Sequence, residues 1–176
     1  MAFGRTIPRE ALRPLVVAIL AIVIPLFHLG APWLVARLGP RWGWSAGHPS
    51  ALNLLGVLPL LTGGVLLGSL LITVLGVIPA LPPRVPLGLR PARLIQTGPY
   101  ARMRHPIYVA ESCLWAGMIL LLGSPVAAAV FAALAAAGCR WLIPREERAL
   151  EKHFGEEYRR YRARVPAIPR FRRSVE

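Results

Sequence analysis

Residues 97–108, TGPYARMRHPIY, form a polar stretch that stands between long apolar parts of the chain. Two phenols, two guanidiniums and an imidazole occur within it, from Tyr100, Arg102, Arg104, His105 and Tyr108. Proline is favoured in the first turn of a helix, because its missing N–H would have no partner there. We therefore predict that a helix begins at Pro106, with His105 at or near its N-cap. The positive end of such a helix offers a site for an anion.

Length and composition restrict the class of protein. The chain has 176 residues, so we expect one domain over residues 1–176. Hydrophobic residues make up 55% of the chain, yet its formal net charge is +13. The apolar residues occur in long blocks, and the charges lie in the gaps between them. This pattern indicates an integral membrane protein rather than a water-soluble basic protein that binds nucleic acid.

Four apolar segments are candidates for membrane helices, at residues 12–35, 51–81, 106–123 and 126–143. The first is too long for the apolar part of a secretory signal peptide, and we expect it to bend or loosen at Pro25. The second is either one tilted helix or a helix broken near Pro59 or Gly63–Gly64. The short turn at residues 123–125 makes the last two an antiparallel hairpin. We expect an all-α polytopic protein with about four transmembrane helices, of which residues 12–81 form the N-terminal membrane helices.

The distribution of charge predicts how the chain is oriented. Residues 1–13 carry a net charge of +2, residues 37–41 +2, residues 84–104 +5, residues 123–125 zero and residues 140–176 +5. With four spans, the first, third and last of these segments share one side of the membrane, which the positive-inside rule assigns to the cytoplasm. We therefore expect the N- and C-termini, and the polar stretch before Pro106, to be cytoplasmic.

A second polar stretch, PREERALEKHFGEEY, occupies residues 144–158. Apolar residues recur from there at steps of three and four, as on one face of a C-terminal amphipathic cytoplasmic helix: Leu150, Phe154, Tyr158, Tyr161 and Val165. Four residues before Leu150 is Glu146, which we predict on the buried or membrane-facing side, with Glu147 offset from it. A carboxylate there needs a partner and is a functional candidate. The other interpretation is a helix-start carboxylate that the dipole favours.

Several short motifs, in this order, resemble those of the isoprenylcysteine carboxyl methyltransferase and phospholipid methyltransferase superfamily of integral-membrane enzymes. They are Gly98-Pro99-Tyr100, Arg104-His105-Pro106-Ile107-Tyr108, Glu146-Glu147, Phe154-Gly155-Glu156-Glu157-Tyr158 and Arg164-Val165-Pro166. The resemblance covers residues 93–169, whereas the first two apolar segments match only in being apolar.

The resemblance implies transfer of a methyl group from S-adenosyl-L-methionine to a lipid or lipid-tailed acceptor at the cytoplasmic membrane face. Carried over to this chain, the cofactor-binding residues would be Ala92, Arg93, Leu94, Ile95, Tyr100, His105, Pro106, Ile107, Tyr108 and Glu146, in a catalytic region of residues 92–169. We expect Arg104, Glu111 and Glu146 to take part in the reaction. The acceptor supplies the nucleophile, so the protein need only align it and exclude water, and we assign no metal.

The chain departs from the superfamily's prenylcysteine enzymes at one position. Those enzymes carry an arginine one helical turn before the glutamate pair, where it meets the carboxylate of the substrate. This chain has Leu142 there, and Arg140 or Arg145 would have to replace that arginine. A prenylcysteine substrate is therefore not implied.

Glu111 is an acidic residue within the third apolar segment, on the same helix face as Tyr108 and Trp115. It is either neutralised by Arg102 or Arg104, or it binds a cationic or amine substrate. An isolated histidine such as His28 is interpreted as a packed or interfacial residue.

Two other function classes remain open. Membrane sterol reductases carry a similar ending and use NADPH, although the FGEEY and RVP motifs fit methyltransferases better. A non-enzymatic scaffold or small transporter would leave Glu146 and the polar stretch without a role. The membrane bilayer and a lipid-tailed substrate are the expected partners, with no nucleic acid and no protein partner implied.

Overall fold

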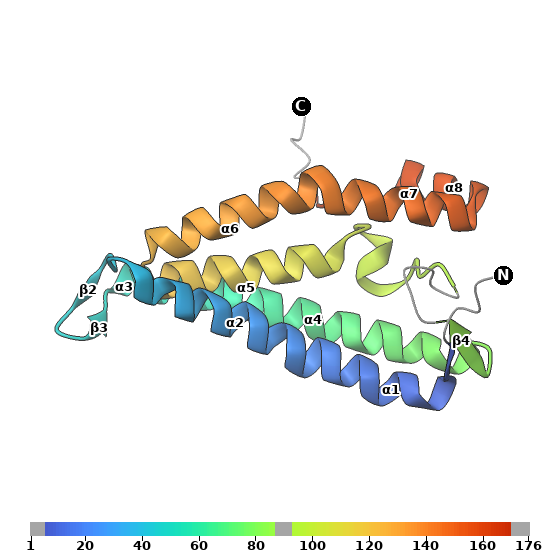
Figure 1. Ribbon diagram of the computed structural model, residues 1–176, viewed down its shortest axis with the longest axis horizontal. Coiled ribbons are helices and arrows are strands. Elements are labelled where there is room, and N and C mark those ends of the chain that lie inside the picture. Colours follow the sequence, from blue (N-terminus) through green and yellow to red (C-terminus); the bar gives the residue numbers. More distant parts are fainter. Residues whose placement is uncertain (1–5, 87–92, 170–176) are drawn as a thin grey trace, which may run out of the picture.

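The computed structural model describes residues 6–86 and 93–169, and its helices run side by side in an elongated bundle (Figure 1). The fold is all-α, as predicted, apart from two short antiparallel ladders. One joins β1 (Thr6–Pro8) to β4 (Arg84–Pro86), and the other joins β2 (Trp44–Ser45) to β3 (His48–Pro49). The β1–β4 ladder ties the start of the first long helix to the residues that follow the second.

The first long helix is continuous from Arg9 to Leu38. It consists of α1 (Arg9–Val17), a π-helical segment η1 (Ala18–Val23), α2 (Ile24–Val35) and a closing 3₁₀ turn η2 (Ala36–Leu38). The π-helical segment lies directly before Pro25. Because proline lacks an N–H and its ring crowds the carbonyl four residues earlier, the wider helical turn accommodates it. The predicted loosening at Pro25 is confirmed.

The second long helix, Ala51–Ala80, is interrupted once. Its parts are α3 (Ala51–Leu54), α4 (Val57–Val77) and the 3₁₀ turn η3 (Ile78–Ala80). The interruption falls at residues 55–56, whereas α4 passes through the two predicted break points, Pro59 and Gly63–Gly64. Pro59 is tolerated because it lies in the first turn of α4.

Glycines let α4 approach α5 (Pro106–Leu122) closely. A Cβ on Gly63 would lie 2.9 Å from the carbonyl oxygen of Ala110, and one on Gly56 would collide with the carbonyl oxygen of Gly117. At Gly64 and Gly68 no described atom lies within 4 Å of such a Cβ. Gly56 and Gly63 therefore permit the close packing of α4 on α5, whereas Gly64 and Gly68 do not lie at this contact.

The third long helix, Pro125–Phe154, contains α6 (Pro125–Ala137), the π-helical segment η5 (Gly138–Leu142) and α7 (Ile143–Phe154). The predicted hairpin with α5 is present: Gly123 turns the chain with φ +59° and the Ser124 hydroxyl caps α6. The predicted end of this helix at residue 143 is wrong. A π-helical segment precedes Pro144, as at Pro25, so the helix continues through the proline and α6 runs directly into α7 (Figure 1).

The predicted single amphipathic helix is divided into α7 and α8 (Glu156–Arg164). The division is at Gly155, whose φ of +55° is open to a residue without Cβ. The apolar residues of both helices still form one cluster, in which Leu94, Tyr158 and Tyr161 are buried and Leu150, Phe154 and Val165 pack against them.

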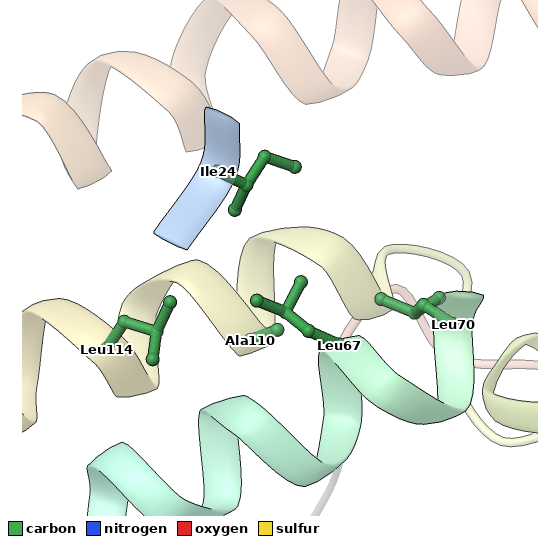
Figure 2. Close-up of a cluster of buried hydrophobic side chains, with 5 residues drawn as sticks. All are labelled: Ile24, Leu67, Leu70, Ala110 and Leu114. Atoms are coloured by element: carbon green, nitrogen blue, oxygen red, sulfur yellow. The ribbon is translucent and has the colours of Figure 1, made fainter. Parts of the chain in front are cut away.

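Helix α5 lies at the centre of the bundle and packs against α2, α4 and α6. Figure 2 shows the cluster that joins α2, α4 and α5, made of Ile24, Leu67, Leu70, Ala110 and Leu114. The outward faces carry large exposed apolar side chains, among them Leu26, Leu58, Val65, Ile72 and Leu134. Within the described residues, the three long helices are each long and apolar enough to cross a membrane, and α5 is a shorter apolar helix. These features are typical of an integral membrane protein.

Asn53 connects three parts of the bundle. It forms a capping box with Ser50, and its amide donates to the carbonyl oxygens of Trp42 at 3.1 Å and Leu120 at 2.8 Å. Asn53→Ala would remove both of these hydrogen bonds and the capping box, although the Leu120 carbonyl would keep its bond from the Gly123 N–H. We expect the free energy of unfolding to fall by about 2 kcal/mol. Thermal unfolding in detergent tests this, with Thr62→Ala as control, since Thr62 is exposed and its hydroxyl donates to the Leu58 carbonyl oxygen of its own helix. Equal melting temperatures for the two variants would contradict the expectation.

Candidate functional site

An ion-pair network forms where the chain enters α5. The Arg104 guanidinium donates to Glu147 Oε1 from Nε at 2.9 Å and from Nη2 at 2.6 Å. His105 Nε2 lies 3.1 Å from the same oxygen. His105 is the N-cap residue and Pro106 the first residue of α5, as predicted. His105 is 3% exposed and the Glu147 side chain 12%, so the network is largely enclosed.

Arg104 and His105 also hold the end of α8. Arg104 Nη1 donates to the carbonyl oxygens of Arg162 and Val165. The backbone N–H groups of Arg104 and His105 donate to the carbonyl oxygens of Pro166 at 2.9 Å and Ala167 at 3.0 Å. The RHP and RVP motifs, which are distant in the sequence, therefore lie side by side. Because these partners occupy the guanidinium, Arg104 serves to position the elements that it joins.

Glu146 lies next to this network and has a different environment. Its Oε2 accepts a hydrogen bond from the Tyr108 hydroxyl at 3.0 Å and lies 3.8 Å from His105 Nδ1. The side chain of Glu146 is 42% exposed, against 12% for Glu147. Helical periodicity assigned the enclosed position to Glu146, yet Glu147 is the more enclosed of the two. Periodicity registers only apolar neighbours, whereas the burial of Glu147 comes from its ion pair with Arg104.

Three tyrosines, Tyr100, Tyr158 and Tyr161, lie near the ion-pair network. The Tyr161 hydroxyl donates to the backbone oxygen of Tyr100 at 2.7 Å. Tyr158 is fully buried, and its hydroxyl has no hydrogen-bond partner among the described residues. Burial, together with the Glu147 carboxylate and against the effect of Arg104, raises the pKa of Tyr158 to about 12. Burial and the neighbouring tyrosines raise the pKa of Tyr161 to about 12, and burial and Glu146 raise that of Tyr100. All three phenols are therefore protonated donors at neutral pH.

The other residues predicted for cofactor binding are dispersed. Leu94 lies in the tyrosine cluster, and Arg93 is exposed. Ile107 packs against the apolar cluster of Ile24 and Leu67, and Pro106 is buried at the start of α5. Ile95 is half-buried, and Ala92 lies outside the described residues. The structure thus brings Tyr100, His105, Tyr108 and Glu146 together around the start of α5.

Glu111 has a partner that the sequence did not suggest. Its Oε1 lies 3.4 Å from Nε2 of His28 on α2, and the other ring nitrogen of His28 accepts a hydrogen bond from Trp115 Nε1 at 2.8 Å. Arg104 is bound to Glu147, and Arg102 lies in a groove against α4. Neither arginine forms an ion pair with Glu111 in the described part of the chain. The contact joins residues more than eighty positions apart, and no pattern in the sequence indicates it.

Glu111 and His28 line a cavity of about 210 Å³ between α2, α5 and the α6–α7 helix. Its walls are mainly apolar and include Phe27, Phe131, Leu134, Leu142 and Ile143. Tyr108 also lines the cavity, and its hydroxyl donates to Glu146, which is not among the lining residues. Within residues 6–86 and 93–169 no group of three or more His, Cys, Asp or Glu side chains could hold a metal ion.

Arg104→Ala tests the ion-pair network. The substitution leaves the enclosed Glu147 carboxylate without its guanidinium and frees the end of α8, so we expect the free energy of unfolding to fall by about 3 kcal/mol. Arg102→Ala, in the same loop but exposed, is the matched control. Thermal unfolding in detergent measures both. A loss for Arg104→Ala no larger than that for Arg102→Ala would show that the network does not support the fold.

Comparison with known proteins identifies the family. The model of the family described as PEMT, phospholipid methyltransferase, matches residues 52–157. Protein-S-isoprenylcysteine O-methyltransferase B of Arabidopsis thaliana is 35% identical over 75 residues, which are 43% of this chain and 38% of the relative. The chain thus aligns with well under half the length of that relative. No solved structure matches the chain. Because the family match covers more than half of the chain and includes both the RHPIY motif and the glutamate pair, the chain belongs to the phospholipid methyltransferase family.

Proposed function

We propose that this protein is a membrane methyltransferase that transfers a methyl group from S-adenosylmethionine to a lipid or lipid-tailed acceptor at the cytoplasmic face. Membership of the family and the name of the plant relative support methyl transfer. The observation that carries the proposal is the contrast between the two adjacent carboxylates. The carboxylate of Glu147 is already bound by Arg104 and His105. Glu146 is held by the Tyr108 hydroxyl and remains accessible to a ligand.

The residues present fit a donor of this chemistry. S-adenosylmethionine carries an ammonium group, ribose hydroxyls, a carboxylate and a sulfonium. Glu146 would accept from the ammonium group or the ribose, and the rings of Tyr100 and Tyr108 would face the sulfonium. The N-terminal N–H groups of α5 would meet the carboxylate. The buried hydroxyl of Tyr158, which has no hydrogen-bond partner among the described residues, would be a further donor near this set.

The roles of the protein residues follow from this assignment. The bound donor supplies an electrophilic methyl group, so the chain needs to orient it and exclude water rather than attack it. Glu146 and Tyr108 bind and orient. His105 and Arg104 hold the first turn of α5 against α7 and the end of α8, and so fix the distance between the elements that bind. Leu94 and Ile95, which belong to the predicted binding segment, would cover the donor from the side of the tyrosines.

We also propose that α5 is a fourth membrane span. Its 17 residues extend about 26 Å, slightly less than the roughly 30 Å of hydrocarbon. The three long helices pack around α5, and each of them is long enough for the bundle as a whole to span the hydrocarbon. The up-and-down order of four helices would place both chain ends, Glu146 and the arginines of α8 on one side, which the excess of arginine assigns to the cytoplasm. The exposed arginines of α8 would then lie at anionic lipid headgroups.

Calorimetry on the detergent-purified protein tests the donor. We expect S-adenosylhomocysteine to bind and NADPH not to bind. Glu146→Gln keeps the shape of the side chain and removes its charge, so we expect binding to weaken about tenfold or more. Glu156→Gln is the matched control, since Glu156 is an exposed carboxylate on α8 whose partner in the described part of the chain is Arg159.

Two outcomes would contradict the proposed activity, and a third would contradict the role of Glu146. Binding of NADPH without S-adenosylhomocysteine would indicate a reductase of the sterol type. Failure of both ligands to bind a protein that melts cooperatively would favour a non-enzymatic membrane protein. Equal binding by Glu146→Gln and Glu156→Gln would remove Glu146 from the donor site.

A further inference from the structure

The cavity between α2, α5 and the α6–α7 helix carries a carboxylate and an imidazole among mainly apolar walls. The side chains of Glu111 and His28 are 23% and 14% exposed and lie 3.4 Å apart. Such groups are costly in a membrane protein unless they are paired or serve a ligand. The contact between Glu111 and His28 provides such a pairing in part. Because Glu111 lines the cavity, its carboxylate is also open to a molecule inside it.

The cavity adjoins the residues proposed to bind the methyl donor. Tyr108 lines the cavity, and its hydroxyl donates to Glu146 on the other side. From Tyr108 to Trp115 the polar groups follow one face of α5 over about 10 Å, since a helix rises about 1.5 Å per residue. A head group held at Glu111 would therefore lie one helical turn from Tyr108. This is the place from which an acceptor could reach the donor.

The apolar walls lead to the outside of the bundle. Phe27, Leu134 and Leu142 line the cavity and are also exposed on its outer surface, which faces hydrocarbon in a membrane. A hydrocarbon tail could therefore lie between α2 and the α6–α7 helix while the head group meets Glu111. The space suits an amphipathic molecule that enters from the bilayer.

The charges at the cavity select the head group. Among the described lining residues, no arginine or lysine is present, and Leu142 stands at the position discussed above for a carboxylate-binding arginine. Arg140 and Arg145, which could have replaced that arginine, are exposed and lie outside the lining. A carboxylate placed beside Glu111 would meet a like charge, whereas a cationic or N–H-bearing head would be attracted.

The hydrogen bond from Trp115 determines which ring nitrogen of His28 donates to Glu111. The indole N–H of Trp115 can only donate, so His28 Nδ1 accepts and the hydrogen of the neutral ring lies on Nε2, toward Glu111. Trp115 is itself held by stacking on Phe131, with ring centroids 5.7 Å apart. His28 comes from α2, outside the residues 52–157 that the family match covers.

We propose that this cavity is the acceptor site, and that Glu111, positioned by His28, makes it select an amine-bearing lipid over one that carries a free carboxylate. The assignment rests on the proposed methyl transfer. The bound ammonium passes one proton to the Glu111 carboxylate, and the nitrogen lone pair then forms the new N–C bond. The bond between the methyl carbon and the donor sulfur breaks with its electron pair on sulfur, and the product is a methylammonium.

The test compares two probes with the same tail and opposite charge, dodecylamine and dodecanoate. Their binding to the full chain in phosphatidylcholine nanodiscs is measured at pH 7 by equilibrium dialysis of radiolabelled probe, with empty nanodiscs subtracted. We expect the amine to bind about tenfold or more tightly than the acid, and Glu111→Gln to remove this preference. Glu10→Gln, a carboxylate exposed on α1, is the matched control and keeps it.

Two substitutions of His28 separate positioning from packing. Glutamine can accept from Trp115 through its oxygen and donate to Glu111 through its nitrogen, so we expect His28→Gln to keep the preference for the amine. Phenylalanine fills similar space without either hydrogen bond, so we expect His28→Phe to lose most of it. Equal preferences for these two variants would overturn the positioning role of His28.

Binding of S-adenosylhomocysteine to the same samples distinguishes the two proposals. If the analogue binds but the wild-type protein shows no preference for dodecylamine, or Glu111→Gln retains that preference, the assignment of the cavity is wrong and the donor site stands. If the preference is present and depends on Glu111 but the analogue does not bind, the cavity is an amine-binding site in a protein that does not transfer methyl groups. Where the analogue binds, its binding also shows that the variant is folded, and cooperative thermal unfolding shows this where it does not.

Discussion

The ion pair between Arg104 and Glu147 is the contact on which the site depends. It joins the loop before α5 to α7 in an enclosed environment, where either charge without the other would be strongly unfavourable. The same guanidinium holds the end of α8 through Val165, and His105 shares the carboxylate. The loop before α5 is thereby joined to α7 and the end of α8, which lie some forty residues or more further along the chain. The neighbouring Glu146 is left accessible in a defined orientation, which is what a ligand-binding carboxylate requires.

The long helices supply the frame for this contact. Pro25 and Pro144 each follow a π-helical segment, and in both places the helix continues where a proline would otherwise end it. At Pro144 the consequence reaches the site, because the continuous α6–α7 helix carries Glu146 and Glu147 from the apolar bundle to the start of α5. A separate helix beginning at Pro144 could point in another direction, and Glu146 and Glu147 would then lie away from the start of α5.

Helix α5 links the two regions on which the functional proposals rest. Its first residue follows His105 in the polar network, and its next turns present Tyr108 and Glu111 to the cavity. Tyr108 belongs to both regions, since its ring lines the cavity and its hydroxyl bonds Glu146. One helix face thus separates a polar binding region from an apolar one within about two turns. This arrangement suits a reaction between a polar donor and a lipid-tailed acceptor.

The sequence by itself determined the features that depend on near neighbours. The apolar blocks indicate the long helices, the geometry of proline fixes the start of α5 at Pro106, and Gly123 requires the turn into α6. Resemblance of short motifs indicated the family. Only the tertiary structure decided that Glu147 is the enclosed carboxylate and that Glu111 meets His28. Both depend on contacts between distant residues, and an ion pair overrides the apolar periodicity from which burial is predicted in a sequence.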